Sequence, residues 1–348
     1  MKDKIRVGII GTGMFGRHHI ESFQRSGRAK VVHLANRGSL SRNAAQADYG
    51  IARASADALD LIGDPEIDAV VVATPPDSHA EFGIAALEAG KHLLLEKPMA
   101  ANLGDAQRLV DCAAAHPGQV ALEASCRHTR LHAKFRFIKD FIDSGRIGRV
   151  YHIHQQSVSR NGFYEYNPNG AGWCFDKSKA GGGPMIDMGE YDLGFHLGLL
   201  GDRPELLDLQ AMAVSGLRHY PGHKVSIEQH AAAWLRFSGD LTYYLERGGP
   251  VAMDAPEETR IYGSAGGLRF TWQTWLPWSM EWCHDGPDGQ PVSQSIAIPQ
   301  PLGQNDDDEV AGHFLDCVAN GAAPAMHFAL ALRHFQISLA IVSGTRMV

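Results

Sequence analysis

The sequence predicts two domains: an α/β domain with a doubly wound parallel sheet, and an α+β domain built on a large, mostly antiparallel open sheet. Three observations carry this prediction. Strand and helix patterns alternate over residues 1–125, a fully apolar β-branched run lies among them, and from residue 126 onward the strands lengthen while helices become fewer. A chain of 348 residues also suits two domains of about 150 residues each. We therefore expect one domain over 1–125 and a second over 126–348.

Regular alternation of strands and helices is expected in the first domain. The run Ala69–Ala73 is entirely apolar and β-branched at its centre, which is typical of a strand buried on both faces of a parallel sheet. The βαβ rhythm around it indicates a doubly wound sheet. In chain order the expected elements are strand Ile5–Ile10, helix Phe15–Arg25, strand Val31–Ala35, helix Leu40–Tyr49, strand Ala69–Ala73, helix Glu81–Ala89, strand Leu93–Glu96, helix Leu103–Ala114 and strand Gln119–Ala124.

Longer strands and fewer helices characterise the second domain, which indicates an α+β architecture. The acidic run Asn305–Glu309 precedes a helical pattern, and carboxylates suit a helix N-terminus, so we expect a solvated helix start there. The expected elements are helix Phe135–Asp143, strands Val150–Ser157, Leu207–Ser215, Ala231–Phe237, Leu241–Glu246, Arg260–Gly263 and Leu268–Trp272, and helices Tyr191–Leu200, Val310–Ala319 and Phe328–Ser343.

Composition excludes several classes of protein. Lys and Arg number 32 against 39 Asp and Glu, a net charge of −7, which argues against a general nucleic-acid surface. No apolar stretch approaches the roughly 18–20 residues of a membrane span, and the start of the chain leaves no room for a signal peptide before the first strand. The five cysteines are widely spaced and form no CxxC, so free thiols in the cytoplasm are expected. The histidines show no zinc spacing, and no metal is predicted.

A glycine fingerprint, Gly11-Thr12-Gly13-Met14-Phe15-Gly16, directly follows the first expected strand and opens a helix. In that context the first glycine permits a tight turn, the second lets the backbone approach a pyrophosphate, and the third lets helix and strand pack closely. Free amide groups at the helix start then face the phosphates. The first domain is therefore predicted to bind a dinucleotide through Gly11, Thr12, Gly13, Met14 and Phe15.

The choice of dinucleotide depends on the end of the second strand, where the chain reads Asn36-Arg37-Gly38-Ser39. An acidic residue usually binds the ribose diol of NAD at this point, whereas an arginine accommodates the 2′-phosphate of NADP. Here the acid is absent, and Arg37 can stack on adenine and pair with a phosphate. NADP is therefore favoured over NAD. The alternative is that Asn36 binds the ribose of NAD and Arg37 is only a surface residue.

The tripeptide Glu96-Lys97-Pro98 ends another expected strand. It therefore lies at the carboxyl edge of the parallel sheet, where such sheets bind their ligands. An amine at that edge can share a proton with a hydroxyl that is being oxidised. Thr74, Pro75 and His79 follow the neighbouring strand and are expected near the cofactor; the alternative for His79 is that it only holds its loop.

Taken together, these segments resemble the Gfo/Idh/MocA oxidoreductases, relatives of glucose–fructose oxidoreductase and inositol dehydrogenase. The resemblance runs over nearly the whole chain; besides the fingerprint and Glu96-Lys97-Pro98 it rests on Ala73–His79, Ser144–Gly148 and Gly181–Tyr191. It implies a Rossmann domain, a C-terminal domain with an open sheet, and hydride transfer between a nicotinamide and a sugar or cyclitol carbon. It also implies a proton-transfer role for Lys97 and a homodimer or homotetramer assembled through the C-terminal sheet.

Many family members carry Asp and His four residues apart in the last of these segments. This chain has Asp187 and Tyr191 there, and so resembles a tyrosine-type branch of the family. Phenol titrates near pH 10, but the Lys97 ammonium and a positive nicotinamide ring would both favour the phenolate. Our hypothesis is that Tyr191 transfers the proton, Lys97 lowers the Tyr191 pKa, and Asp187 binds a neighbouring hydroxyl or orients Lys97. The alternative is that Tyr191 only packs against its neighbours and hydrogen-bonds a backbone group.

Further substrate contacts are expected from the loop 160–179, which is rich in polar and aromatic groups such as Arg160 and Trp173. Such groups bind the hydroxyls and the C–H faces of sugar rings. His196 is not on the helix face shared by Asp187 and Tyr191 and is expected to point elsewhere. Two other functions remain open beside a sugar dehydrogenase or reductase: a redox-assisted glycosidase of the same family, and a non-catalytic sugar or nucleotide sensor.

Overall fold

The computed structural model describes residues 4–167, 172–303, 305–344 and 346–347. The protein consists of two units. The first contains Met1–Arg127, Ser178–Gly181 and Gln304–Phe335, and the second contains His128–Lys177, Gly182–Gly303 and Gln336–Val348. The first unit therefore includes a late segment, 304–335, which no single boundary near residue 125 describes.

A six-stranded parallel sheet in the order β3-β2-β1-β4-β5-β6 forms the centre of the first unit. The order reverses between β1 and β4, which makes the sheet doubly wound, as predicted. All four residues of β4 are fully buried, as its apolar sequence requires. The strands are β1 (Ile5–Ile10), β2 (Ala29–Ala35), β3 (Arg53–Ser55), β4 (Ala69–Val72), β5 (His92–Leu95) and β6 (Ala121–Glu123).

The longer helices of this unit are close to those expected, and several short segments come in addition. Strand β3 and the five-residue helix that follows it were not predicted, because segments this short do not establish a period. The helical segments are α1 (Met14–Arg25), α2 (Ser39–Tyr49), α3 (Ala58–Ile62), η1 (Pro76–Ser78), α4 (His79–Glu88), α5 (Leu103–Ala115), η2 (Ala124–Cys126), α8 (Lys177–Ala180), α11 (Asp306–Asn320) and the start of α12 (Phe328–Val342).

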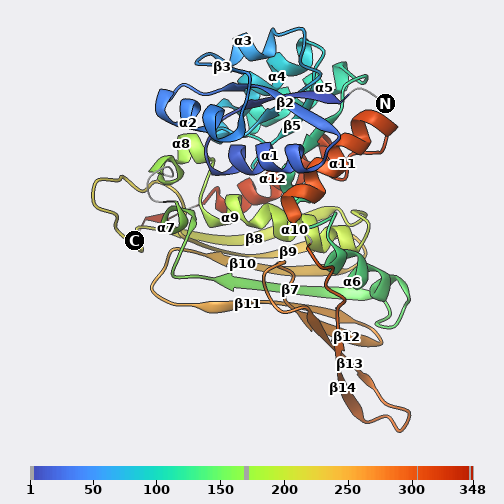
Figure 1. Ribbon diagram of the computed structural model, residues 1–348. Coiled ribbons are helices and arrows are strands. Elements are labelled where there is room, and N and C mark those ends of the chain that lie inside the picture. Colours follow the sequence, from blue (N-terminus) through green and yellow to red (C-terminus); the bar gives the residue numbers. More distant parts are fainter. Residues whose placement is uncertain (1–3, 168–171, 304, 345, 348) are drawn as a thin grey trace. The chain divides into compact units, whose positions relative to one another are not determined.

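Helix α11 lies beside α1, as Figure 1 shows. The contact includes Phe23 and Phe314, whose rings meet edge to face at 6.2 Å between centroids. The Asn305 side chain caps α11 by accepting hydrogen bonds from the amides of Asp307 at 2.9 Å and Asp308 at 3.2 Å. The expected helix start is thus confirmed.

The expected solvation of the acidic run is wrong for Asp307, whose side chain is only 18% exposed, whereas that of Asp308 is 38% exposed. Asp308 pairs with Arg25 of α1 at 2.8 Å, and Asp307 pairs with the buried Arg127 at 2.7 Å. These carboxylates bind α1 and Arg127 across about 180 to 280 residues of sequence, a distance over which local charge patterning carries no information.

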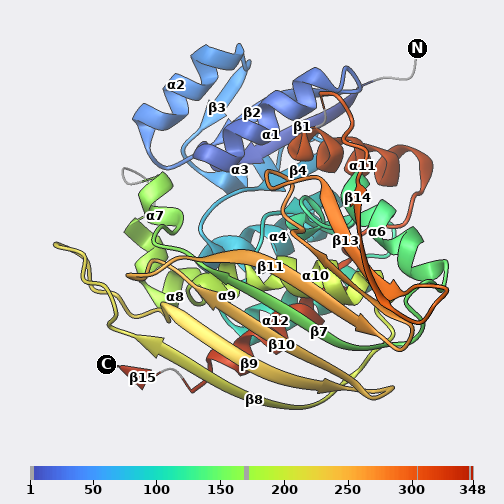
Figure 2. The same cartoon turned by 90° about the horizontal axis from the view of Figure 1, so that it is seen from below.

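A nine-stranded sheet in the order β14-β13-β12-β11-β7-β10-β9-β8-β15 forms the second unit (Figure 2). Neighbouring strands are antiparallel except for β7 with β10 and β8 with β15. The prediction of a large, mostly antiparallel sheet is confirmed. The strands are β7 (Val150–Val158), β8 (Leu206–Ser215), β9 (His230–Phe237), β10 (Leu241–Gly248), β11 (Ala255–Gly263), β12 (Gly266–Phe270), β13 (Ser279–Asp285), β14 (Pro291–Ala297) and β15 (Arg346–Met347).

The hairpin of β13 and β14 was not predicted. Most side chains of β14 are exposed, so the strand lacks the alternation of apolar and polar residues by which a half-buried strand is recognised. The strand β14 is formed by its backbone pairing with β13 over seven residues.

Helices pack on one face of the large sheet, as Figure 1 shows for α6, α9 and α10. Residues Tyr191, Phe195 and Leu199 of α10 are four apart and form an apolar stripe, which packs with strand residues that include Ile261 and Phe270. The helical segments of this unit are α6 (Ala133–Asp143), α7 (Phe163–Tyr166), η3 (Gly172–Phe175), α9 (Pro184–Asp187) and α10 (Gly189–Leu199).

A second stripe of α10 is polar and equally buried. Asp192 accepts two hydrogen bonds from the Arg247 guanidinium, each 2.6 Å long, and a third from Trp272 Nε1 at 2.9 Å. This bidentate geometry compensates for the burial of both charges. The Asp192–Arg247 pair joins α10 to β10, and the hydrogen bond from Trp272 joins α10 to the residues that follow β12.

His196, one turn further along, continues this network. Burial lowers the pKa of His196 to about 3, so its ring is neutral. Thr259 Oγ1 donates to Gln155 Oε1 at 2.6 Å and therefore accepts from His196 Nε2 at 3.0 Å. His196 Nδ1 then accepts from the Tyr243 hydroxyl at 2.7 Å. As predicted, His196 points away from the face of Tyr191.

One carboxylate of this network links stability to pH. Glu257 Oε1 accepts from the Trp272 amide at 3.2 Å, whereas Oε2 is buried without a hydrogen-bond partner in the described part of the chain. Burial raises the pKa of Glu257 from 4.5 to about 7. Because the pKa is higher in the folded state, the contribution of protonated Glu257 to the unfolding free energy is fully present below pH 4.5. This contribution is lost as pH rises towards 7.

We expect Glu257→Gln to reduce the loss of unfolding free energy between pH 5 and pH 8 by about 1–3 kcal/mol. Urea unfolding at a series of pH values measures this loss. Glu205→Gln, at an exposed position, is the control and should leave the pH dependence unchanged. An unchanged pH dependence in Glu257→Gln as well would contradict the assignment.

Candidate active site

The glycine turn after β1 has the geometry of a ligand-binding loop. Gly11 has a φ of +99°, and a Cβ there would collide with the Ala73 carbonyl oxygen. At Gly16 a Cβ would collide with the carbonyl oxygen of Gly11. A Cβ at Gly13, in contrast, would have no neighbour within 4 Å. The fold thus requires two of the glycines, and the third leaves open space at the start of α1.

The start of α1 is accessible and is fixed from two sides. Gly13 is its N-cap, and no side chain caps the helix. Thr12 is buried, with its hydroxyl 2.8 Å from that of Ser41. Phe15 lies beneath the Arg127 guanidinium, 4.9 Å from Cζ to the ring centroid. The first amides of α1, with half-buried Met14, are therefore positioned to face an anion.

The end of β2 presents one arginine to solvent and uses the other internally. Arg42 donates to the Asn36 carbonyl oxygen at 2.7 Å, and Asn36 Nδ2 donates to the Gly38 carbonyl oxygen at 3.1 Å. Arg37 is exposed, and the described residues give its side chain neither a hydrogen bond nor an ion pair. Arg37 is therefore available to a ligand, whereas Arg42 shapes the turn.

His79 joins two segments at the carboxyl edge of the sheet. Its Nε2 lies 2.8 Å from the carbonyl oxygen of Thr74, and its Nδ1 lies 2.9 Å from that of Pro98. The ring is fully buried. His79 thus holds the Thr74–Pro75 loop against the Glu96-Lys97-Pro98 turn, in which the Lys97–Pro98 peptide bond is cis.

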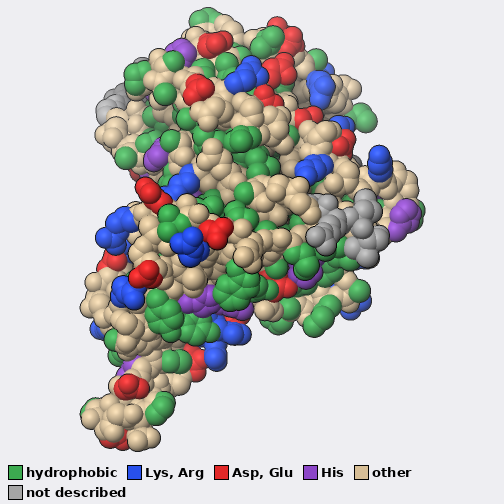
Figure 3. Space-filling view, turned by 180° about the vertical axis from the view of Figure 1, so that it is seen from behind, with side chains coloured by type: hydrophobic (Ala, Val, Ile, Leu, Met, Phe, Trp, Pro, Cys, Tyr) green, Lys and Arg blue, Asp and Glu red, His purple; other side chains and the backbone are tan. Residues whose placement is uncertain are grey.

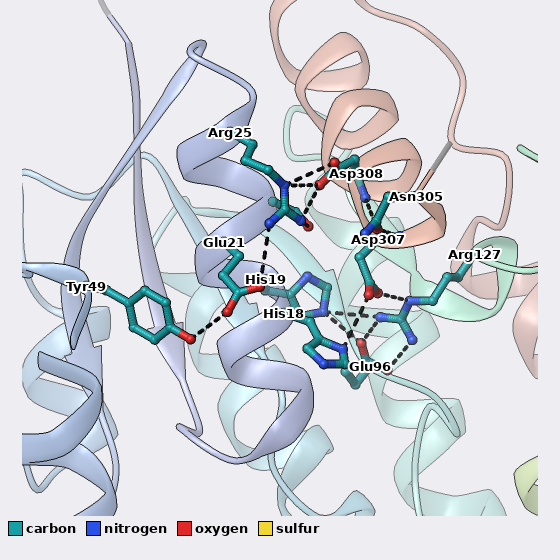
Figure 4. Close-up of polar contacts among 11 residues, drawn as sticks. His18, His19, Glu21, Arg25, Tyr49, Glu96, Arg127, Asn305, Asp307 and Asp308 are labelled. Carbon is teal, nitrogen blue, oxygen red and sulfur yellow. Dashed lines mark hydrogen bonds and ion pairs between the residues drawn. The ribbon is translucent and has the colours of Figure 1, made fainter. Parts of the chain in front are cut away.

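Glu96 is the centre of a buried charge network (Figure 4). Its Oε1 accepts from His19 Nε2 of α1 at 2.7 Å, and both of its oxygens accept from Arg127. Arg127 in turn pairs with Asp307 of α11 at 2.7 Å. The side chains of Glu96 and Arg127 are only 5% and 1% exposed, so both carboxylate oxygens of Glu96 face protein groups.

The charges of this network stabilise one another. Burial by itself would raise the pKa of Glu96, but Arg127 and His19 hold it well below its usual range. Burial would likewise raise the pKa of Asp307, but the hydrogen bond with His18 and the charge of Arg127 lower it to about 2. Glu96 is therefore a carboxylate at neutral pH, and it positions Lys97, whose amide lies 3.3 Å from Glu96 Oε2.

Sequence reasoning missed Glu123, which ends β6 opposite Leu95 of β5. Its Oε2 accepts from the amide of Ser125 at 2.8 Å, and Oε1 is buried without a hydrogen-bond partner among the described residues. Burial raises the pKa of Glu123 to about 7, the charge of Glu96 adds to this rise, and Lys97 opposes it. The signal in the sequence was a carboxylate at the end of an otherwise apolar strand.

In the second unit, Glu228 holds the glycine run that precedes Asp187. Glu228 accepts from the amides of Gly183 at 2.7 Å and Met185 at 3.0 Å. A Cβ at Gly183 would collide with the carbonyl oxygen of Glu228. The glycine run therefore allows α9 to start directly on this carboxylate, a dependence that the sequence did not reveal. Burial raises the pKa of Glu228 to about 7.

Asp187 and Tyr191 are four residues apart in the sequence, but they belong to two helices rather than to one. Asp187 ends α9 and Tyr191 is the third residue of α10. The two helices meet at Met188, whose carbonyl oxygen accepts from Asp192 at 3.2 Å. The Tyr191 ring is 2% exposed and lies 5.1 Å from that of His128.

The remaining expected residues are dispersed over this unit. Arg160 lines a cavity of about 530 Å³ together with Asn161, Leu217, Arg218, Val251, Ala252 and Asp254. Trp173 does not line this cavity and packs near Phe163, 5.9 Å between ring centroids. Residues 168–171 of their loop lie outside the described residues. Arg130, near the start of this unit, is bound to Asp202 through hydrogen bonds of 2.6 and 2.7 Å.

Each unit thus collects one set of candidate residues. The glycine turn, Thr74, Pro75, His79, Glu96 and Lys97 share the carboxyl edge of the parallel sheet, whereas Asp187 and Tyr191 lie in two consecutive helices, α9 and α10. The described residues contain no group of three His, Cys, Asp or Glu side chains arranged to hold a metal ion.

No helix in the described ranges has both the length and the apolar character needed to cross a bilayer.

The network around Glu96 leads to a stability prediction. Arg127→Met leaves the carboxylates of Glu96 and Asp307 buried without their shared countercharge, so we expect a loss of about 3–5 kcal/mol of unfolding free energy in urea. Adding Glu96→Gln should recover part of this loss, because the two residues interact directly. Arg25→Met, which removes the exposed pair with Asp308, is the control and should cost less than about 1 kcal/mol. Equal losses for the two arginine variants would contradict the prediction.

Two family models match the chain. Residues 5–124 match an oxidoreductase family with an NAD-binding Rossmann fold, and residues 135–269 match the GFO/IDH/MocA C-terminal domain. The two matches coincide with the parallel sheet and with most of the large sheet.

Individual relatives agree with these matches. The chain is 33% identical to 1,5-anhydro-D-fructose reductase of Ensifer adhaerens over 240 residues, 68% of this chain and 67% of the reductase. It is 36% identical to inositol 2-dehydrogenase 2 of Saccharopolyspora erythraea over 163 residues, 46% of each chain. A solved structure of levoglucosan dehydrogenase in complex with NADH and levoglucosan shares the fold, with a TM-score of 0.84 and 22% identity over 98% of this chain and 97% of that one. The chain therefore belongs to the GFO/IDH/MocA oxidoreductase family.

Proposed function

We propose that this chain is an NAD(P)-dependent dehydrogenase or reductase that acts on a CH–OH group of a sugar or sugar-like polyol. The observation that carries the proposal is the position of Lys97 at the carboxyl edge of β5, directly after a carboxylate that a buried arginine fixes. An amine held at that edge suits proton exchange with a substrate hydroxyl.

The first unit fits a nicotinamide dinucleotide. Gly13 leaves space for close approach of a pyrophosphate, the start of α1 has no side-chain cap, and exposed Arg37 suits a 2′-phosphate. When bound, the nicotinamide accepts or supplies the hydride. We favour NADP because no carboxylate stands at Asn36 or Arg37 to bind a free ribose diol.

The protein's own groups would handle the proton and the orientation of the substrate. In this proposal the phenolate oxygen of Tyr191 takes the proton of the reacting hydroxyl in oxidation, and the resulting Tyr191 hydroxyl returns a proton in reduction. Lys97 polarises the same oxygen and favours the Tyr191 phenolate by its positive charge. Asp187 accepts a hydrogen bond from a neighbouring substrate hydroxyl. Glu228 fixes the start of the helix that ends at Asp187.

A polyhydroxylated ring is the proposed substrate class. The names of the relatives include 1,5-anhydro-D-fructose, inositol and levoglucosan, all of which are rings with several hydroxyl groups. Hydride transfer at one ring carbon while fixed polar groups bind the neighbouring hydroxyls would suit this class.

We further propose that the protein forms a homodimer through the outer face of the large sheet. That face carries an aromatic cluster formed by Tyr151, His152, Trp234, Tyr244 and Tyr262, of which Trp234 is 56% exposed. Figure 3 shows hydrophobic and histidine side chains next to one another on the surface. Exposed apolar clusters of this kind are typical of interfaces. Sedimentation that gives a monomer at micromolar concentration would contradict this.

Nicotinamide absorbance across cyclitols, anhydrosugars, aldoses and methyl glycosides tests the activity. Reduction with one of these classes is expected. Lys97→Met and Tyr191→Phe should each lower kcat by about a hundredfold, a typical contribution of general acid–base catalysis, and nucleotide affinity should change little. Tyr49→Phe, far from these residues in sequence and bonded to Glu21, is the control. Full activity in Lys97→Met would exclude the proposed role.

The cofactor preference has its own test. Arg37→Ala should weaken NADP binding at least about tenfold, the loss expected when a charged hydrogen bond is removed, and should weaken NAD binding less, because NAD has no 2′-phosphate and loses only the contact with adenine. Lys30→Ala, at an exposed position of the same strand, should affect neither nucleotide. Equal binding of NADP by the Arg37 variant and the unmodified protein would contradict the preference for NADP.

A further inference from the structure

The loop between β12 and β13 presents a tryptophan to solvent. It contains three tryptophans, of which Trp272 is fully buried and Trp278 is partly buried, whereas Trp275 is 59% exposed. Single exposed apolar side chains are common and need no explanation. Trp275 differs because its loop is held by a buried charge and because it lies beside the ring that contacts Tyr191.

Lys134 of α6 fixes the conformation of this loop. Its buried ammonium group donates to four carbonyl oxygens of the loop, those of Thr271 at 3.1 Å, Gln273 at 2.8 Å, Leu276 at 3.3 Å and Pro277 at 3.1 Å. An ammonium has three protons, so the four oxygens share them. Because a buried charge is stable only when it is fully hydrogen-bonded, Lys134 requires the loop to keep this shape.

Contacts of Trp278 reinforce the same shape. Its ring lies 5.3 Å from Lys134 Nζ and 4.9 Å from the ring of His132, and its Nε1 donates to the Thr274 carbonyl oxygen at 3.0 Å. Thr274 directly precedes Trp275. The backbone that carries Trp275 is therefore anchored on both sides, so ordering this side chain on a ligand would cost little additional conformational entropy.

Trp275 is separated from Tyr191 by a single ring. The rings of Trp275 and His128 meet edge to face, 5.3 Å apart at 90°, and the ring of His128 lies 5.1 Å from that of Tyr191. All three residues belong to the second unit. A ligand that reaches the Tyr191 hydroxyl from the side of His128 would thus pass the indole of Trp275.

We infer that Trp275 is a substrate-binding residue on which the C–H face of a sugar or cyclitol ring stacks while a ring hydroxyl is bound at Tyr191. The inference rests on the proposed function and adds to it a residue for ring recognition. A pyranose or cyclitol presents several C–H bonds on one face, and an indole offers a large, rigid, electron-rich surface to them. An acyclic polyol has the same hydroxyls but no fixed C–H face.

Calorimetry with nucleotide present tests the inference without requiring turnover. The probes are levoglucosan, myo-inositol and methyl β-D-glucopyranoside, with the acyclic polyol D-glucitol as the comparison. We expect at least one ring to bind, about tenfold weaker binding in Trp275→Ala, and recovery to within about threefold in Trp275→Phe, because phenyl also stacks. Affinity for D-glucitol and for the nucleotide should be the same in all three proteins.

Several results would overturn the inference. They are equal ring affinities in Trp275→Ala and the unmodified protein, a loss that Trp275→Phe does not recover, an equal loss for D-glucitol, and no binding of any ring to the unmodified protein. A surface that contacts another protein would give the first of these. Binding without nicotinamide reduction would overturn the proposed dehydrogenase activity and leave the stacking site in place, so the two failures are distinguishable.

Kinetics and a second variant separate stacking from folding. Where a ring is turned over, Trp275→Ala should raise KM about tenfold and change kcat less than about threefold. Lys134→Met should weaken ring binding although Trp275 is intact, because the loop loses the ammonium that holds it. Lys139→Met, on the same helix but paired with Asp143 at 2.8 Å, is the matched control. Unchanged ring binding in a folded Lys134→Met protein would contradict the role of the fixed loop.

Discussion

A buried carboxylate next to a buried guanidinium is the constraint on which the nucleotide-binding unit depends. Glu96 directly follows β5, His19 belongs to α1, Arg127 follows β6 and Asp307 lies in the first turn of α11, and all four meet in one charge network. Each charge would be costly to bury alone, so the elements that carry them must come together as a set. Lys97 is the next residue after Glu96, and its place at the edge of the sheet follows from this arrangement.

The second unit repeats the same physical solution with different residues. Helix α10 has an apolar stripe, which includes Tyr191, and a polar stripe, in which Asp192 is bound to Arg247 and Trp272. The apolar stripe stabilises the helix on the sheet without selecting one register, whereas the bidentate pair accepts a single arrangement. In both units, therefore, a candidate catalytic side chain directly follows or precedes a buried, paired carboxylate.

Local patterns in the sequence predicted much of this structure. The glycine turn and the apolar strand Ala69–Val72 each depend on neighbouring residues, and each was correctly placed. Asp307 was assigned to solvent because its partner Arg127 is 180 positions away, and Glu228 was overlooked because the glycines that need it lie 45 positions earlier. The importance of Trp275 depends on carbonyl oxygens that converge on Lys134, and a sequence carries no record of where carbonyl groups point.

The inclusion of residues 304–335 in the first unit has a consequence for biosynthesis. A ribosome that adds about 5–20 residues per second needs roughly 10–40 s to proceed from Arg127 to Asp307. During that interval the parallel sheet has emerged, but α11 does not yet exist to cover α1 and to balance the charge of Arg127. The nascent nucleotide-binding unit would therefore remain a client for chaperones until almost the whole chain has left the exit tunnel.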